Sequence, residues 1–267
     1  MIKKTIRLSW LALVLLFMYV PVLTLMVYSF TDTSVIGTAG NFSLKNYVTL
    51  FTTEELSDMI RGTFALAVGS AAISTALGTV GAIGAFYSRS GGRRALNFLN
   101  QIPVVNAEVV TGFSLCVLLI VVFGRSKETF FPLVAGHVVL EAPFVYLSVL
   151  PRLKQMDNSI YEAARDLGAG AASALFRVVL PQLVPGIVSG FMLAVTLSLD
   201  DYFITTYTKP ATFDTISTYV VNATRGSHTE IKTALWALSA VIFVLILAVV
   251  LTGNFVTGKR MEAENDR

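Results

Sequence analysis

Long apolar runs separated by shorter polar segments dominate the chain from end to end. A membrane-spanning helix needs about 20 mostly apolar residues, and six runs reach that length. They predict helices over residues 8–30, 63–88, 102–123, 129–151, 182–207 and 233–257. The period-2 alternation of barrel strands is absent from these runs. The pattern therefore predicts an all-α, polytopic membrane protein, with residues 1–267 as a single transmembrane domain.

The first run follows Lys3, Lys4 and Arg7, which raises the alternative of a cleaved signal peptide. The apolar run is longer than a signal-peptide core, and no small-x-small cleavage site follows Phe30. We therefore expect a retained first helix. The second run is rich in Gly, Ala and Ser, a composition typical of close helix packing in membranes.

Composition supports a membrane protein. Hydrophobic residues make up 54% of the chain, charged residues 14%, and mean hydropathy is +0.70. Soluble domains carry about 25% charged residues. These values exclude a cytosolic enzyme, a disordered chain and a nucleic-acid binder. Cys116 is the single cysteine, so neither a disulfide framework nor a thiol-rich metal site is expected.

Basic residues are distributed unevenly between the polar segments. If both termini are cytoplasmic, 13 of the 20 Lys and Arg residues fall on the inside and seven on the outside. Cytoplasmic loops of membrane proteins carry such an excess. The distribution predicts that both termini are cytoplasmic.

One inner loop, residues 152–181, has a helix-forming, alanine-rich composition. Ile160, Ala163, Ala164 and Leu167 fall on one helical face. Gly168 stands where a helix end favours a left-handed residue. We expect a short cytoplasmic helix whose exposed face needs a partner surface.

The same loop resembles the EAA motif of permease subunits of binding-protein-dependent ABC importers. Glu162-Ala163-Ala164 is followed after three residues by Gly168, and after nine more by Val178-Val179-Leu180-Pro181, where Val178 replaces the family's Ile. The resemblance implies the type I ABC importer permease fold with six transmembrane helices. It also implies that the loop is a coupling helix docked in a groove of the ATPase. The residues implied in ATPase coupling are Glu162, Ala163, Ala164, Asp166, Gly168, Leu180 and Pro181.

Segments 28–30, 42–47 and 197–210 resemble the C-type permease of spermidine/putrescine importers. The resemblance implies a polyamine substrate and a bacterial inner-membrane location. The implied partners are an ABC ATPase dimer, a second related permease and an extracytoplasmic polyamine-binding protein. It implies no cofactor in this chain, with ATP and Mg on the ATPase.

A phosphate-binding loop and a metal site are both rejected. Residues 253–259 mimic a phosphate loop, but Arg260 replaces its Ser or Thr, and the segment ends a predicted span rather than following a strand. His137 and His228 have no ligand-spaced partner. We therefore expect no enzyme activity in this chain and an energy source on another subunit.

Four acids fall inside the apolar runs: Glu108, Glu141, Asp200 and Asp201. An acid at the centre of a spanning helix costs about 2.5–3.5 kcal/mol on insertion scales, so such residues are candidates for function. Carboxylates can replace water around ammonium groups, and aromatic faces attract cations. Tyr207 is one aromatic candidate. The predicted substrate pathway consists of Glu108, Asp200, Asp201 and Tyr202.

Structural alternatives stand beside each acid. Adjacent helical positions point about 100° apart, so one of Asp200 and Asp201 can instead cap a helix or pair with a basic residue. Glu108 can make a structural contact, and Glu141 can bond backbone groups freed by Pro143. A rise of about 1.5 Å per residue places Glu108 and Asp200 at different depths.

Three other functions are weighed against a polyamine permease. The same kind of permease can import another small solute. A stand-alone secondary transporter leaves the inner-loop motif unexplained. An intramembrane enzyme lacks an accompanying nucleophile or metal constellation.

Overall fold

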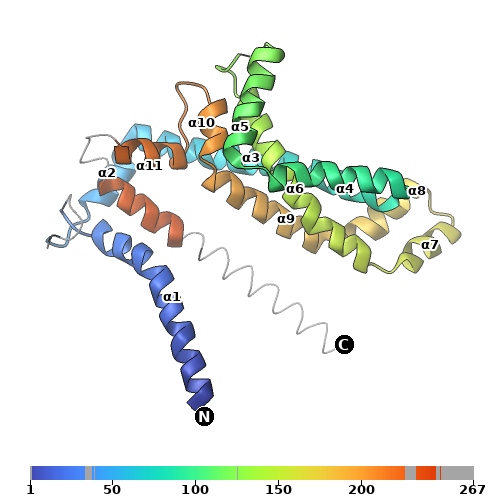
Figure 1. Ribbon diagram of the computed structural model, residues 1–267, viewed down its shortest axis with the longest axis horizontal. Helices are drawn as coiled ribbons and strands as arrows, with labels where there is room; N and C mark the ends of the chain where they lie inside the picture. The colour runs from blue at the N-terminus through green and yellow to red at the C-terminus, as the bar shows by residue number, and fades with distance from the viewer. Residues whose placement is uncertain are drawn as a thin grey trace. The chain divides into compact units, whose positions relative to one another are not determined.

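The computed structural model describes residues 2–33, 38, 40–124, 126–225, 233–244 and 247 (Figure 1). Within them the backbone is helical or irregular, with one isolated antiparallel bridge between Thr31 and Phe42. The chain divides into two compact units, 1–58 with 220–267, and 59–219, which are described separately. The prediction of one domain over 1–267 stays a prediction.

Helices follow one another along the described parts of the chain. In chain order they are α1 (Ile2–Ser29), α2 (Lys45–Thr52), α3 (Glu54–Tyr87), α4 (Ser90–Val105), α5 (Glu108–Cys116), α6 (Phe131–Gln155), α7 (Asn158–Asp166), α8 (Ala171–Ala174), α9 (Leu180–Asp200), α10 (Phe203–Thr208) and α11 (Ile216–Arg225). Two π-helical segments, Val117–Val122 and Leu175–Val179, extend α5 and join α8 to α9.

Among the described residues, four helices are long and apolar enough to cross a membrane. They are Arg7–Ser29, Glu54–Tyr87, Phe131–Gln155 and Ala171–Asp200. A fifth span results if α4 and α5 with its extension form one broken span, bent by 104°. For the sixth predicted span, only the short apolar helix Thr233–Val244 and residue 247 are described. The rest of that span, His228 and the phosphate-loop mimic lie outside the described residues.

The prediction of one continuous helix over 102–123 differs from the structure. The helix begins earlier, at Ser90, and is interrupted at Asn106, whose backbone is extended (φ −76°, ψ 145°). Pro103 lacks an N–H for the last turn of α4. The Asn106 side chain then donates to the Thr111 hydroxyl (3.1 Å) at the start of α5. A bend therefore replaces the straight span.

The predicted helix over 182–207 is also divided. Helix α9 ends at Asp200, Asp201 is extended (φ −65°, ψ 124°), and α10 follows. Apolar residues flank the two aspartates on both sides, but the Asp201 carboxylate accepts from N–H groups in the first turn of α10. A side-chain cap of this kind begins a new helix.

Helix α6 is the centre of the unit 59–219, where it contacts α4, α5, α9 and α10. Small residues allow neighbouring backbones to approach it. A Cβ on Gly190 would lie 3.2 Å from the Cα of Val145, and one on Gly78 would lie 2.7 Å from the Ala142 carbonyl oxygen. Gly186 lies four residues before Gly190, and a Cβ on it would lie 3.2 Å from the Ser148 carbonyl oxygen. Helix α9 therefore packs on α6 through a Gly-x-x-x-Gly face.

In the unit 1–58 with 220–267, the end of α1 is closed by the loop that precedes α2. The Asn46 side chain donates to the carbonyls of Ser29 (3.1 Å) and Thr31 (3.0 Å). The ring of Phe30 lies 4.9 Å from that of Tyr47. The segments 28–30 and 42–47, which the sequence singled out separately, thus form one contact region.

Candidate functional site

Helix α7 begins with a side-chain cap in the inner loop. An oxygen of the Asp157 side chain accepts from the Ser159 N–H (2.9 Å). This bond, with one from the Ser159 hydroxyl, lowers the pKa of the Asp157 carboxyl, while desolvation opposes it. A charged carboxylate at this position satisfies one of the free N–H groups of the helix start.

Helix α7 ends in a Schellman motif centred on Gly168, which has φ +88°. The Gly168 N–H donates to the Arg165 carbonyl (3.0 Å). The Ala169 N–H donates to the Ala164 carbonyl (3.0 Å). This pair of bonds requires a left-handed residue at the first position after the helix, which glycine adopts without strain. The predicted glycine break is confirmed.

Much of α7 faces solvent. Glu162, Ala163 and Asp166 are exposed, whereas Ala164 is half-buried. Leu167 is 90% exposed. On the side of α7 that faces the rest of the unit, half-buried Tyr161 packs against α3, with its ring 5.7 Å from the ring of Tyr87. Ile160 of the same helix is 45% exposed, so α7 presents two large apolar side chains to solvent.

The last two motif residues, Leu180 and Pro181, form the first turn of α9. Proline suits this position because its missing N–H would be unpaired there in any case. Pro181 is exposed and Leu180 half-buried, while the preceding Val179 is buried in the core of α3, α6 and α9. The motif therefore joins the exposed loop directly to a core helix.

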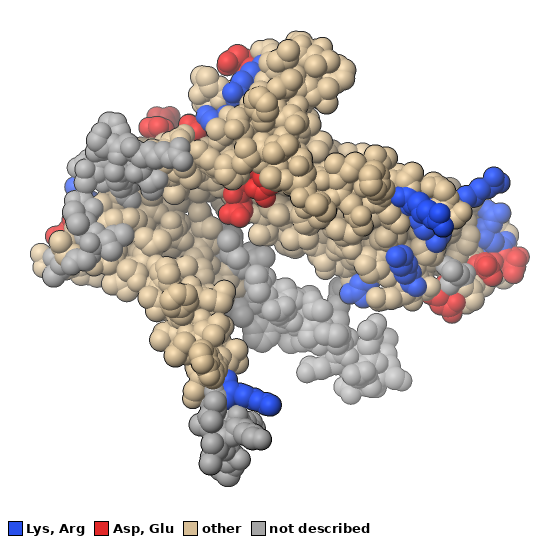
Figure 2. Space-filling model, viewed as in Figure 1, with Lys and Arg blue, Asp and Glu red and all other residues tan. Residues whose placement is uncertain are grey.

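Figure 2 shows Lys and Arg side chains gathered at the end of the unit 59–219 that carries α4, α7 and α8. The basic residues of α4 and the position before it, the last turn of α6, α7 and the π-helical segment before α9 are Arg89, Arg93, Arg94, Arg152, Lys154, Arg165 and Arg177. Acidic side chains lie near the middle of the view and also at this end, where Asp157, Glu162 and Asp166 are exposed in and beside α7.

Asp201 lies at the break between α9 and α10 and is 3% exposed. Its carboxylate accepts from the backbone N–H groups of Ile204 (3.2 Å) and Thr205 (2.7 Å). It also accepts from the Thr205 hydroxyl (2.7 Å). This is the capping arrangement that the sequence analysis set beside a pathway role. The carboxylate points into the protein rather than into an open path.

Asp200 and Glu108 are exposed carboxylates in the same neighbourhood. Glu108 is the first residue of α5 and lies within electrostatic range of both Asp200 and Asp201. Close packing brings α5 here, since a Cβ on Gly112 would lie 3.0 Å from the Cα of Ile204 in α10. The bend at Asn106 and this contact thus bring the start of α5 to the α9–α10 break, which a straight span over 102–123 was not expected to do. Half-buried Tyr202 occupies the break itself.

Glu141 is completely buried and does not bond backbone groups near Pro143 as one alternative expected. Its two oxygens accept from the hydroxyls of Ser70 (2.7 Å) and Ser74 (2.8 Å) of α3. His137, one turn earlier on α6, is also completely buried. Sequence analysis missed this pairing, although a spacing of four residues places both side chains on one helical face.

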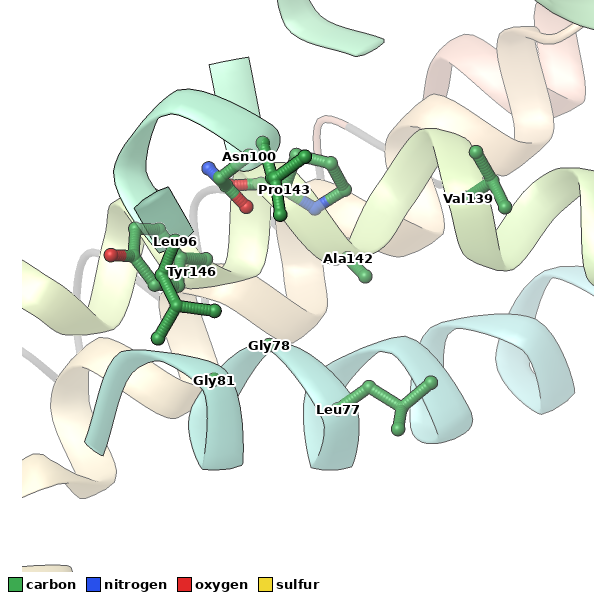
Figure 3. A pocket seen from close by; sticks show the side chains of 10 residues that line it. Leu77, Gly78, Gly81, Leu96, Asn100, Val139, Ala142, Pro143 and Tyr146 are labelled. Atoms are coloured by element: carbon green, nitrogen blue, oxygen red, sulfur yellow. The ribbon is translucent and has the colours of Figure 1, made fainter. Parts of the chain in front are cut away.

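The cavity in Figure 3 lies between α3, α4 and α6 and has a volume of about 290 Å³. Its lining is apolar except for Asn100 and Tyr146, and Asn100 donates to the Pro143 carbonyl (3.3 Å). No Asp or Glu belongs to the lining. The cavity therefore lacks the groups that a cation site needs, unlike the α5–α10 region.

Comparison with known families assigns the chain to a class. Residues 1–261 match the family model described as the inner membrane component of binding-protein-dependent transport systems, and the chain belongs to this family. It is 28% identical to the spermidine/putrescine permease PotC of Haemophilus influenzae, over 95% of this chain and 97% of that one. It is 30% identical to the putrescine permease PotI of Escherichia coli, over 85% of this chain and 84% of that one.

Solved structures show the same fold. A crystal structure of a bacterial alginate ABC transporter with its alginate-bound periplasmic protein contains a chain that matches with a TM-score of 0.73 and 20% identity, over 96% of this chain and 93% of that one. A chain in a second crystal structure, of a bacterial ABC transporter that imports alginate, matches with a TM-score of 0.72 and 22% identity. The match covers 97% of this chain and 98% of that one. The predicted ABC importer permease fold is confirmed.

The protein is thus a multi-pass inner-membrane permease of a binding-protein-dependent ABC importer. It works with a binding protein and with an ATPase, and the separate ATPase subunit hydrolyses ATP. The permease itself is not an enzyme and holds no cofactor. Family membership excludes the stand-alone secondary transporter and the intramembrane enzyme.

Proposed function

We propose that this importer carries polyamines of the spermidine/putrescine type. One observation carries the proposal: the exposed carboxylates of Glu108 and Asp200 lie within electrostatic range of each other at the meeting point of α5 and the α9–α10 break. A linear polyamine presents ammonium groups separated by methylene chains. Two neighbouring carboxylates can accept charge-assisted bonds from such groups in place of water.

Aromatic rings complete this candidate pathway. Tyr202 stands directly after the two aspartates, and Tyr207 faces Phe113 of α5 at 5.8 Å. Their faces can contact ammonium and methylene groups in turn. We assign Glu108, Asp200 and Tyr202 to direct contact with substrate and Asp201 to their support. The names of the PotC and PotI relatives agree with this substrate class.

The assembly around this chain follows from the same proposal. This chain forms half of the translocation path, and a second related permease forms the other half. An extracytoplasmic polyamine-binding protein delivers the substrate. The ATPase receives α7 in a groove, with contacts from Glu162, Ala163, Ala164, Asp166 and Gly168, while Leu180 and Pro181 pass the movement to α9.

The orientation proposal rests on charge. Basic residues gather at the α7 end of the unit 59–219 (Figure 2). Cytoplasmic segments carry such an excess, so we place this end and both termini in the cytoplasm. The α9–α10 break then lies toward the opposite side of the bilayer from the ATPase.

Uptake by the reconstituted transporter tests the substrate. The complex is placed in liposomes that contain ATP, and the binding protein outside is loaded with radiolabelled spermidine or putrescine. We expect uptake to fall about tenfold in Asp200→Asn and in Glu108→Gln, because each loses a charged acceptor. Glu128→Gln is the matched control, since Glu128 is an exposed acid of the short turn before α6.

Each outcome has a distinct meaning. Uptake that falls in both variants but not in the control supports the proposal. If both variants take up polyamine at the wild-type rate, these acids are not part of the pathway. Failure to carry either polyamine, together with uptake of another solute, overturns the substrate and leaves the permease family intact.

A further inference from the structure

A buried polar network ties four helices together beside the candidate pathway. Its centre is His137 on α6, which is completely buried. The ring Nδ1 lies 2.8 Å from the Ser198 hydroxyl of α9, and Nε2 lies 3.0 Å from the Thr205 hydroxyl of α10. Glu141 extends the network to Ser70 and Ser74 of α3, as described above. Neither the proposed pathway nor the coupling segment uses His137.

The hydrogen bonds decide which ring nitrogen carries a proton. The single proton of the Thr205 hydroxyl is donated to the Asp201 carboxylate. The hydroxyl oxygen can therefore only accept from His137, so Nε2 must be a donor. On the other side, the Ser198 hydroxyl can either donate to Nδ1 or accept from it.

Charge decides the second nitrogen. Nδ1 lies 3.6 Å from the Glu141 carboxylate, and Nε2 lies 3.8 Å from the Asp201 carboxylate. Both carboxylates are buried. In the part of the chain that the structure describes, His137 is the group that could carry a positive charge within ion-pair distance of each carboxylate. Two buried negative charges around a neutral ring would be left uncompensated, which is strongly unfavourable.

A proton on Nδ1 fits the hydroxyl groups that surround the ring. Nδ1 then donates to Ser198, whose hydroxyl lies 3.5 Å from that of Ser70. Ser70 in turn donates to Glu141. Of the titratable groups, Glu141 faces the ring from its own helix and Asp201 from the α9–α10 break. Glu108 of α5 approaches Asp201 from outside.

We propose that His137 is an imidazolium held between Glu141 and Asp201, and that this buried triad is the positioning element for Asp200. Asp201 fixes the start of α10, and His137 fixes Asp201 through Thr205. Asp200 is the last residue of α9 and precedes Asp201 directly, so its direction at the pathway depends on the same break. The role for transport rests on the proposed function, whereas the charge of the ring does not.

Nitrogen NMR tests the charge without any transport measurement. The whole complex is labelled with ¹⁵N-histidine near pH 7, and the His137 signals are identified by their loss in His137→Gln. Two protonated ring nitrogens, each with a one-bond coupling to hydrogen, support the proposal. A single protonated nitrogen overturns it. If His137→Gln does not assemble, Ser198→Ala identifies the signals instead, because it shifts the Nδ1 resonance selectively.

A double-mutant cycle tests the positioning role. We expect His137→Gln to lower polyamine uptake about tenfold, which corresponds to about 1.4 kcal/mol, with unchanged ATPase activity in the absence of binding protein. In an Asp200→Asn background the same change should have no further effect, because His137 acts through Asp200. Ser198→Ala should show the same dependence with a smaller loss. Thr196→Ala is the control, since that exposed hydroxyl of α9 bonds only its own helix (2.9 Å).

Additive losses, or a loss of basal ATPase activity, would reduce the triad to a structural role and overturn the positioning proposal. If the transporter carries another cation instead of a polyamine, the cycle is repeated with that cation. Failure of the substrate proposal and failure of this inference are therefore distinguishable.

Discussion

Two helix breaks in the unit 59–219 serve opposite needs. At Gly168 the chain leaves α7 through a left-handed glycine, and a Cβ placed there would meet nothing within 4 Å. At Asp201 the chain passes from α9 to α10 through a buried carboxylate that accepts three hydrogen bonds. The first break depends on backbone conformation alone. The second depends on a network of side chains from several helices.

The difference shows how a permease divides its requirements. Helix α7, which we propose meets the ATPase, ends in local hydrogen bonds that leave its outer face exposed. The α9–α10 break, which we propose lies beside the pathway, is held in addition by contacts with α6 through His137. A change at either break should therefore have a characteristic signature, and three changes make the comparison quantitative.

The largest effect is expected at Asp201. Asp201→Ala removes the acceptor of three donors and the partner of His137, which should destabilise the assembled complex by about 3–5 kcal/mol. Thermal unfolding of the purified complex measures this loss. The neighbouring Asp200→Asn is the control and should leave the unfolding temperature nearly unchanged, because Asp200 is exposed. Equal losses at the two positions would contradict the division of roles.

An intermediate effect is expected at Gly168. Gly168→Ala should destabilise the end of α7 by about 1–3 kcal/mol, since φ +88° strains any other residue. Stimulation of the ATPase by loaded binding protein should fall while the complex still assembles. Gly170→Ala is closely matched, because Gly170 also has open space around it but an ordinary φ of −63°. If both variants lose stimulation equally, backbone conformation is not the cause.

The smallest effect is expected at the Asp157 cap. Hydrogen bonding lowers the pKa of this carboxyl in the folded protein. The carboxylate therefore contributes fully to the stability of α7 at pH values above the ordinary carboxyl pKa. That contribution is lost as the pH falls through the lowered pKa. Hydrogen exchange of the α7 amides should therefore gain protection as the pH rises through this range, after correction for intrinsic exchange rates. Asp157→Asn retains a capping side chain and should lose the pH dependence.

The two breaks also show what the sequence could reveal. Gly168 was predicted because a glycine after an amphipathic segment is a local signal that needs no tertiary contact. Asp201 and Asp200 could not be told apart, because which carboxylate turns inward depends on Thr205 and on His137, 64 residues earlier in the chain. The bend at Asn106 was missed for a related reason. Hydropathy is continuous there, and it does not record where a helix changes direction.

The class of protein was easier to predict from the sequence than the candidate site. Apolar runs located the long helices, since burial in lipid acts on composition over about 20 residues. The approach of Glu108 to Asp200 needed the bend at Asn106 and the close contact at Gly112 together. His137 and Glu141 carried a usable signal, their spacing of four residues on one helix, but their hydroxyl partners come from α3, α9 and α10.

The Gly-x-x-x-Gly face of α9 has a mechanical consequence. Contact of α9 with the α6 backbone through Gly186 and Gly190 makes the two helices a stiff pair. The 21 residues of α9 measure about 30 Å, with Pro181 near one end and Asp200 at the other. If the ATPase moves the Pro181 end as proposed, a rotation of the α6–α9 pair by about 5° would displace the Asp200 end by about 3 Å over that length. This displacement is about the length of one hydrogen bond.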